Sequence, residues 1–185
     1  MTYQIDINNA FLHGDLSPPV YMQQPPGFST DSTLVCRLNK AIYGLKQAHR
    51  TWFQKLSTTL LHLGFVASQS DTSLFTRFTQ SHTIFILIYV DDILVIGSSL
   101  FLVQDFIKQL SLYFALKDLG PLHYFLGIEV SWHKNNSIHL SQAKYIKDLI
   151  RRTNMVNSKP QPSPIFSSLR LTADESVSVD DPTLY

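Results

Sequence analysis

Two adjacent aspartates, Asp91 and Asp92, interrupt the most apolar stretch of this chain. Seven apolar or aromatic residues (84–90) precede the pair, and four apolar residues (93–96) follow it. Burial of a bare carboxylate is costly, and adjacent carboxylates also repel each other. Because neighbouring side chains in a straight strand point to opposite faces, the pair predicts a tight turn between two strands. One carboxylate can then project into a site where a divalent cation relieves the repulsion, although the pair alone also fits an ordinary polar hairpin turn.

The remaining pattern predicts an α+β fold in which helices cover one face of an antiparallel sheet. Strands are predicted over residues 2–7, 74–78, 83–90, 93–96, 123–132 and 138–140. Helices are predicted over residues 45–63, 102–114 and 142–152, the last with Ile146, Leu149 and Ile150 directed inward. Residues 13–28 contain two proline pairs, at 18–19 and 25–26, and are predicted to form an extended loop or an edge hairpin.

Composition and charge bound the class of protein without revealing its activity. With 185 residues, of which 44% are hydrophobic and 12% aromatic, the chain can form one domain with a substantial core. The formal net charge of +1 gives no overall basic field, but five basic residues and no acid lie between Asp31 and Asp71. A second basic stretch spans residues 134–159. Either stretch can meet phosphate or simply form a solvated face.

The single cysteine, Cys36, excludes an internal disulfide and fits a reducing compartment. The longest apolar run, residues 84–90, is too short to cross a bilayer. No secretory signal opens the sequence, since a basic segment followed by a long apolar one is absent there. We therefore expect no membrane partner.

A third carboxylate, Asp6, ends the first predicted strand. Alone it would be interpreted as a cap at a strand end. Together with Asp91 and Asp92 it fits a metal site, because Mg²⁺ prefers a few carboxylates together with phosphate oxygens and water. Sites that transfer nucleotides hold two such ions, one activating the attacking hydroxyl and the other stabilising the leaving pyrophosphate.

Five segments carry a resemblance to a known family: QIDINNAFLHGDL (4–16), VYMQQPPGF (20–28), LNKAIYGLKQAHRTWF (38–53), YVDDILVIG (89–97) and ALKDLGPLHYFLGIEV (115–130). In order and spacing they resemble the reverse transcriptase of copia-type LTR retrotransposon Pol polyproteins, and the resemblance runs from Tyr3 to Tyr185. It implies an RNA-directed DNA polymerase that uses two Mg²⁺ (or Mn²⁺) ions to add nucleotides to a primer 3′ hydroxyl.

The resemblance also implies the right-hand polymerase architecture. Residues 1–133 would form the reverse transcriptase palm. Residues 134–157 would form a hairpin return and a helix at the start of the thumb. Residues 158–185, rich in proline, serine and acids, would be a poorly ordered linker.

Individual residues take roles from the resemblance. It makes Asp6, Asp91 and Asp92 the catalytic, metal-binding acids, with the backbone carbonyl of Ile7 as a further ligand. It makes Phe11 an aromatic steric gate against a ribonucleotide 2′ hydroxyl; without the resemblance, Phe11 would be interpreted as a core aromatic. The other residues implied to contact the nucleotide are Lys46, Gln47, Arg50, Tyr89, Val90 and Lys117, and the implied primer grip is Phe125, Leu126 and Gly127.

Two features depart from the family's pattern. His49 stands where family members usually carry a proline that fixes the entry to a helix, so we expect reduced activity. The chain starts almost at the first catalytic aspartate, so we expect the fingers to be largely missing, the thumb to be partial and apolar surface to be exposed. The alternative function is a truncated, catalytically inactive retroelement remnant with at most weak nucleic-acid binding.

The implied partners are an RNA template, a DNA primer and deoxynucleoside triphosphates. In a full-length element they would be joined by the rest of the Pol polyprotein, with its fingers, RNase H and integrase. Family members copy RNA inside cytoplasmic particles, but no segment of this sequence is recognisable as a targeting signal.

Overall fold

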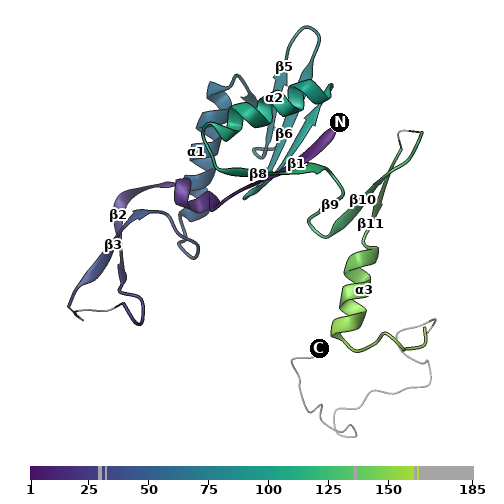
Figure 1. The fold of residues 1–185 in the computed structure, drawn as a ribbon. Helices are drawn as coiled ribbons and strands as arrows, with labels where there is room; N and C mark the ends of the chain where they lie inside the picture. The colour runs from purple at the N-terminus through teal and green to yellow at the C-terminus, as the bar shows by residue number, and fades with distance from the viewer. Residues whose placement is uncertain (29–30, 32, 136, 161, 163–185) are drawn as a thin grey trace, which may run out of the picture. The chain divides into compact units, whose positions relative to one another are not determined.

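The computed structural model describes residues 1–28, 31, 33–135, 137–160 and 162. The chain forms two compact units, Met1–Leu122 and His123–Tyr185, the second described as far as residue 162 (Figure 1). Most of the predicted linker, residues 158–185, lies outside the described residues. No helix in the described part of the chain is both long and apolar enough to cross a bilayer.

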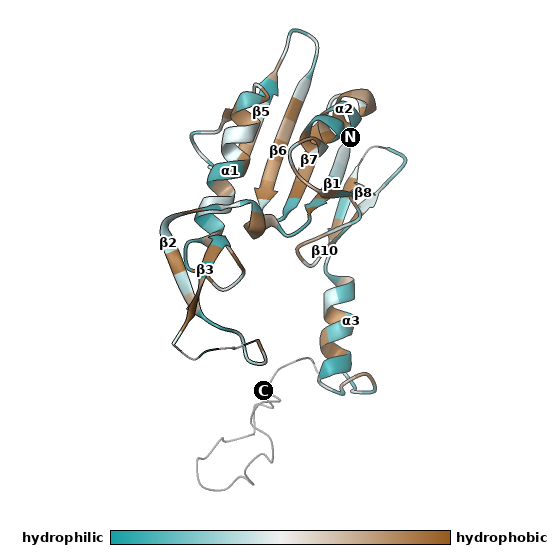
Figure 2. Cartoon of the chain, turned by 60° about the vertical axis from the view of Figure 1, so that its left-hand side comes forward, coloured by the Kyte–Doolittle hydropathy of each residue, from teal (hydrophilic) through white to brown (hydrophobic). Residues whose placement is uncertain are grey.

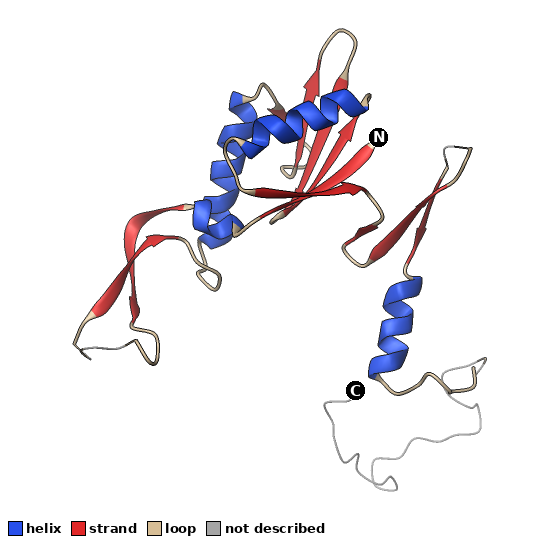
Figure 3. Cartoon of the chain, in the orientation of Figure 1, coloured by secondary structure: helices blue, strands red, loops and turns tan. Residues whose placement is uncertain are grey.

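The first unit is built around a six-stranded sheet with the strand order β4-β5-β6-β7-β1-β8, in which all neighbours are antiparallel. Its strands are β1 (Thr2–Ile7), β4 (Val66–Ala67), β5 (Leu74–Phe78), β6 (Thr83–Tyr89), β7 (Asp92–Gly97) and β8 (Leu116–Pro121). Two helices, α1 (Ala48–His62) and α2 (Leu100–Ser111), pack on one face of this sheet (Figure 3). The predicted α+β class is confirmed.

A short 3₁₀ helix, η1 (Ala10–His13), leads from β1 into a separate two-stranded sheet. That sheet pairs β2 (Asp15–Gln23) with β3 (Val35–Lys40). The predicted extended conformation of residues 13–28 is confirmed over β2, which pairs as one arm of a hairpin.

The order of the elements places β1 between two strands that come much later in the chain. After β1, the chain passes through α1, β4 and β5 to β6, and β7 then returns beside β1. Helix α2 carries the chain on to β8 at the other side of β1. The central strands and helices thus follow the β-α-β-β-α-β arrangement. As a consequence, Asp6 of β1 lies opposite Asp92 of β7.

Alternating burial identifies the face of the sheet that the helices cover. In β6, Ile84, Ile86 and Ile88 are at most 6% exposed, whereas the residues between them are half-buried. Across the sheet, Ile88 pairs with Ile93 of β7, which pairs with Ile5 of β1. Burying each such side chain stabilises the fold by about 1.5–3 kcal/mol. Figure 2 shows the hydrophobic residues that run along β6 and β7.

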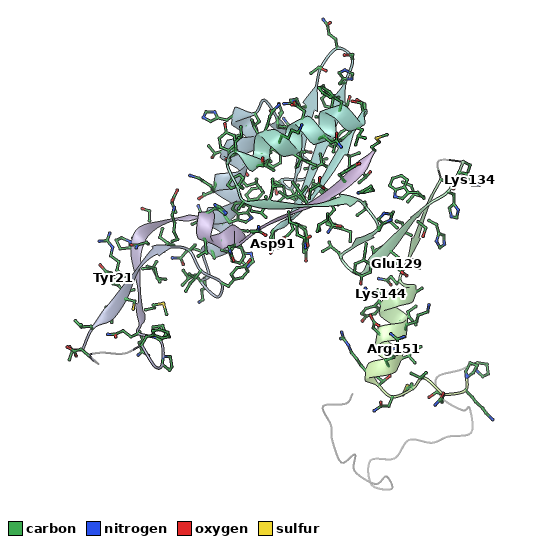
Figure 4. All side chains as sticks on the ribbon, viewed as in Figure 1. Tyr21, Asp91, Glu129, Lys134, Lys144 and Arg151 are labelled. Atoms are coloured by element: carbon green, nitrogen blue, oxygen red, sulfur yellow. The ribbon has the colours of Figure 1, made fainter. Side chains whose placement is uncertain are left out.

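The second unit is a three-stranded antiparallel sheet followed by a helix. Its elements are β9 (Tyr124–Phe125), β10 (Ile128–Trp132), β11 (Ile138–Ser141) and α3 (Ala143–Arg152). Glu129 of β10 joins the helix to the sheet, because its Oε2 accepts hydrogen bonds from the backbone N–H of Lys144 at 3.0 Å and from the hydroxyl of Ser141 at 3.4 Å (Figure 4). The Lys144 ammonium also lies 4.7 Å from the centroid of the Tyr124 ring.

Two predictions for the second unit are wrong. Residues 123–132 do not form one strand, because Leu126 and Gly127 adopt φ angles of 48° and 84° and turn the chain between β9 and β10. The apolar residues of α3 are not directed inward: Ile146, Leu149 and Ile150 are 52%, 46% and 36% exposed. Helical periodicity marks an apolar face but says nothing of what covers it.

The boundaries of the helices differ from those predicted by up to three residues. Helix α1 begins at Ala48 rather than at residue 45, because Gly44 adopts a φ of 95° within a turn closed by a hydrogen bond from the Leu45 N–H to the Ile42 carbonyl. The compact units divide after Leu122, whereas the predicted palm ends at residue 133. The compact units are defined by contacts alone, so the division into palm, thumb and linker stays a prediction.

Candidate functional site

The turn between β6 and β7 consists of Val90 and Asp91, flanked by the paired residues Tyr89 and Asp92. Val90 adopts a φ of 58°, which is uncommon for a β-branched residue. Two hydrogen bonds hold the turn: the Trp52 Nε1–H donates to the Val90 carbonyl at 2.6 Å, and the Ile7 N–H donates to the Asp91 carbonyl at 2.9 Å. The predicted tight turn is confirmed, and α1 and β1 both anchor it.

The sheet brings the three predicted catalytic acids to one end of β1. Asp6 pairs with Asp92 on one side and with Lys117 of β8 on the other, so these side chains project from the same face. That face is opposite to the one packed by α1 and α2, since the adjacent Ile5 and Ile7 are buried in the core. Asp91 follows on the turn, and Figure 4 labels it at this end of the sheet.

Polar neighbours already engage two of the three carboxylates. The amide Nε2 of Gln4 donates to Oδ1 of Asp92 at 3.0 Å. The hydroxyl of Tyr43 donates to Oδ2 of Asp91 at 3.4 Å, a long hydrogen bond. Both donors are neutral, so they orient the carboxylates without neutralising them.

The surroundings of Asp6 disfavour its ionised form. Partial burial raises its pKa above the usual 3.8, and the negative charges of Asp91 and Asp92 raise it further, whereas Lys117 acts in the opposite direction. Asp6 therefore lies among like charges, and of the residues that the structure describes Lys117 is the cation that opposes them. A bound divalent cation would remove this penalty.

Replacing Asp6 by Asn should make the chain more stable at neutral pH in the presence of a chelator. The pKa of Asp6 is higher in the folded state than in the unfolded state, so the ionised carboxylate destabilises the fold above both pKa values. As the pH falls through the raised pKa toward 3.8, the wild-type chain loses this penalty and the difference between the two chains closes. Thermal unfolding at a series of pH values in EDTA measures the effect.

Asp71→Asn is the control, because the opposite change in stability at neutral pH is expected for it. Hydrogen bonds from the hydroxyl and the backbone N–H of Ser73 lower the pKa of Asp71, so its ionised form stabilises the fold. Its replacement should lower stability at neutral pH, and that difference should also close in acid. A stability gain for Asp6→Asn that grows toward acid pH would contradict the electrostatic account of Asp6.

The donor chemistry of the three acids suits a hard divalent cation, because carboxylate oxygens are its preferred protein ligands. Among the described residues, however, no group of three or more His, Cys, Asp or Glu side chains is gathered closely enough to hold a metal ion. The hydrogen bonds from Gln4 and Tyr43 occupy one oxygen each of Asp92 and Asp91. The acids thus share one end of the sheet, and metal binding requires their side chains to reorient.

An aromatic stack lies beside the acids. Phe11, in η1, is 3% exposed, and its ring centroid is 4.3 Å from that of Tyr43 and 4.6 Å from that of His49. Tyr43 is 57% exposed, and partial burial together with the charge of Asp91 raises the pKa of its phenol. The predicted gate residue Phe11 is therefore covered by two rings in this structure.

The sequence reasoning missed Tyr43. The available signal was its position in the segment AIYGLKQ, directly before Gly44 and close to Gln47. Contact with Phe11 and Asp91 depends on tertiary structure, because the three residues lie on η1, a loop and the β6–β7 turn. No local spacing predicts that meeting.

The other predicted nucleotide contacts are spread over the same unit. Gln47 is the residue before α1 and is half-buried, while Lys46 and Arg50 are exposed on either side of it. Tyr89 is 53% exposed at the end of β6. Behind the turn, an apolar pocket of about 170 Å³ is lined by His49, Trp52, Phe53, Ser73, Ile88 and Val90.

The predicted primer grip lies in the second unit. Phe125 ends β9, and Leu126 and Gly127 form the turn into β10. The residues thus sit at the tip of a tight hairpin, where Gly127 allows a φ of 84°. Their role at a primer terminus stays a prediction.

Comparison with known proteins gives consistent matches along the chain. A family described as reverse transcriptase (RNA-dependent DNA polymerase) matches residues 1–167. The retrovirus-related Pol polyprotein from transposon RE2 of Arabidopsis thaliana is 48% identical over 184 residues, which cover 98% of this chain and 13% of that protein. The corresponding polyprotein from transposon TNT 1-94 of Nicotiana tabacum is 39% identical over 173 residues, covering 91% of this chain and 13% of that protein.

A shorter relative matches as well. The putative transposon Ty5-1 protein of Saccharomyces cerevisiae is 32% identical over 183 residues, which cover 98% of this chain and 59% of that protein. This chain therefore corresponds to 13% of the length of each of the two plant polyproteins and to a larger part of the yeast protein.

Proposed function

Because this chain belongs to the reverse transcriptase (RNA-dependent DNA polymerase) family and matches copia-type Pol polyproteins, we propose that it forms the palm of an RNA-directed DNA polymerase. Residues 1–133 would form the palm, and residues 134–157 would begin the thumb. The substrates of the polymerase are an RNA template, a DNA primer and deoxynucleoside triphosphates. The rest of the Pol polyprotein, with fingers, RNase H and integrase, acts beside it in a full-length element.

The observation that carries this proposal is the pairing of Asp6 with Asp92 beside the turn that bears Asp91. Partial burial raises the pKa of Asp6, and the charges of Asp91 and Asp92 raise it further, so the ionised form of Asp6 is disfavoured at this end of the sheet. An arrangement that destabilises the apo chain is typical of a site whose charge is completed by a ligand.

Asp6, Asp91 and Asp92, with the carbonyl of Ile7, would hold two Mg²⁺ or Mn²⁺ ions. When bound, such ions lower the pKa of the primer 3′ hydroxyl and neutralise charge on the triphosphate. Without the ions, a hydrogen bond from the Gln4 amide orients the carboxylate of Asp92, and one from the Tyr43 hydroxyl orients that of Asp91.

Lys117 is suited to the leaving-group side of the reaction. It pairs with Asp6 across β1 and β8, and its side chain is exposed on the acid-bearing face. Its Nζ would hold a proton for the departing pyrophosphate. The remaining assignments concern substrate contacts: Lys46 and Arg50 for phosphate, Gln47, Tyr89 and Val90 for the nucleotide and primer end, Phe11 for the sugar, and Phe125, Leu126 and Gly127 for the primer strand.

Primer extension tests the proposal. The purified chain, and the same chain joined to upstream finger sequence from an intact copia-type element, are each incubated with an RNA template, a labelled DNA primer, deoxynucleotides and Mg²⁺ or Mn²⁺. Extension by either protein supports the polymerase. Extension by the joined protein alone makes this chain an inactive remnant that retains the palm. The absence of extension by both, with primer–template bound, would contradict the proposal.

A further inference from the structure

We propose that His133 and His139 bind one transition-metal ion of the Zn²⁺ class, which joins the two arms of the β10–β11 hairpin. Each imidazole supplies one ligand, and water completes the coordination. Both histidines belong to the second unit, whereas the three candidate catalytic acids belong to the first. The inference therefore goes beyond the proposed polymerase function and does not depend on it.

The register of the hairpin places both imidazoles on one face. His139 of β11 pairs with Ser131 of β10, and beyond that pair the His133 N–H donates to the Ser137 carbonyl at 3.0 Å. Side chains two residues apart along a strand share a face, so His133 is a diagonal neighbour of His139 across the hairpin. Aromatic side chains can reach each other across such a diagonal.

The distance between the two rings suits a shared ion. Their centroids are 6.3 Å apart, and the interplanar angle is 72°. An ion bonded to one nitrogen of each imidazole at about 2.0–2.1 Å lies about 3 Å from each centroid, so the rings of a tetrahedral site have centroids about 5 Å apart. The rings therefore need to approach by about 1 Å, and both side chains are exposed, which leaves them room to rotate.

The ligand type selects the metal. Imidazole nitrogen suits Zn²⁺, Cu²⁺ and Ni²⁺, whereas Mg²⁺ prefers oxygen ligands. The histidine pair is therefore chemically distinct from the carboxylates of the first unit.

Two charged side chains border the histidine pair, and Figure 4 labels both. Lys134 directly follows His133 and is exposed, so water and salt screen its repulsion of a cation. Glu129 shares the face of both histidines, because it lies two residues before Ser131 in β10. Its negative charge favours a cation on this face while its Oε2 stays bonded to the Lys144 N–H.

The ion gives the hairpin a link that its strands lack. Strand β11 has four residues and is the edge strand of the order β11-β10-β9. A short hairpin is at best marginally stable by itself. An ion held by one residue from each arm closes the hairpin, and its binding free energy adds to the stability of the folded unit.

Zinc binding to single and double variants tests the site. The full chain, without a purification tag, is titrated with ZnCl₂ in excess Mg²⁺ by isothermal titration calorimetry. His133→Asn and His139→Asn should each raise the Kd for zinc by about tenfold or more, since even the loss of a group that only orients a ligand costs about 10–100-fold. The double variant should lose less than the product of the two single losses, because either change alone already breaks the chelate.

His82→Asn is the matched control, since His82 is exposed in the turn between β5 and β6 of the first unit. It should leave the Kd within about twofold of wild type. Hydrogen exchange gives a second measurement, independent of affinity. Zinc should slow exchange of the His133 amide, which donates to the Ser137 carbonyl, in the wild-type chain but not in His139→Asn.

Three results would overturn the inference. The first is a Kd that stays unchanged in either single variant, since zinc held at Cys36 or at the acids of the first unit persists in both. The second is a wild-type chain that binds no zinc in excess Mg²⁺. The third is a loss in His82→Asn as large as in His133→Asn. None of these results bears on primer extension, which tests the proposed function separately.

Discussion

Replacing Asp91 by Asn should reduce the rate of primer extension by about a thousandfold or more, the loss expected when several kcal/mol of metal-based transition-state stabilisation disappears. The fold should remain, because Asp91 lies on a turn whose backbone is held by Trp52 and by Ile7 rather than by its carboxylate. Single-nucleotide extension rates with Mn²⁺, measured on whichever of the chain and its finger-joined form is active, give the effect.

Asp105→Asn provides the control for the loss of one negative charge. Asp105 lies on α2, where its carboxylate accepts a hydrogen bond from Gln109 at 2.6 Å. Helix α2 packs on the face of the sheet opposite to the one that bears the acids, so extension should stay within about twofold of wild type, as for most substitutions outside a site. Normal extension by Asp91→Asn would show that the site is wrongly assigned.

Trp52→Ala should produce the largest loss of stability, about 3–5 kcal/mol, the range for truncating a buried large aromatic side chain. Trp52 is 1% exposed, and its ring lies 5.2 Å from that of Phe114 and 5.8 Å from that of His13. Trp52→Phe keeps an aromatic ring but removes the donor to the Val90 carbonyl, which should cost about 1–3 kcal/mol. Urea unfolding followed by far-ultraviolet circular dichroism measures both.

The other tryptophan supplies the control. Trp132 lies in β10 of the second unit and is 44% exposed, so Trp132→Phe should change stability by less than about 1 kcal/mol. Trp52→Phe should also lower extension activity more than its stability loss explains, because the Val90–Asp91 turn loses its anchor on α1. Equal stability losses for Trp52→Phe and Trp132→Phe would mean that the hydrogen bond to Val90 contributes nothing.

Local pattern predicted the strands that are buried on at least one face. The predicted strands over residues 2–7, 74–78, 83–90 and 93–96 match β1, β5, β6 and β7 to within one residue. Runs of β-branched and apolar residues bounded by polar turns determine these strands locally. The tight turn at Val90 and Asp91 followed from the cost of burying two adjacent carboxylates.

Strand β8 was not predicted from the sequence, and the reason is physical. Its sequence, Leu116–Pro121, contains Lys117, Asp118 and Gly120 and has no alternating apolar pattern. It forms because the free edge of β1 offers backbone N–H and carbonyl groups for pairing, and such pairing depends on tertiary structure. The same strand places Lys117 opposite Asp6, a pairing that no local spacing predicts.

Two further differences have the same origin. The apolar face of α3 was predicted from periodicity, yet the described residues leave it exposed, since periodicity does not specify a partner. Tyr43 was missed because its contacts with Phe11 and Asp91 join three separate segments of the chain. The sequence thus predicted which residues belong to the candidate site, but not which residues from other segments contact them.

Anomalous X-ray scattering from crystals soaked in Mn²⁺ would test the central claim most directly. The full chain is crystallised with a dideoxy-terminated primer on an RNA template and a deoxynucleoside triphosphate, so that no reaction occurs. We predict manganese peaks about 2–2.3 Å from carboxylate oxygens of Asp6 and Asp91, with the Tyr43 hydroxyl displaced from Asp91. Manganese bound elsewhere, with Asp6, Asp91 and Asp92 free of metal while nucleotide is present, would contradict the account.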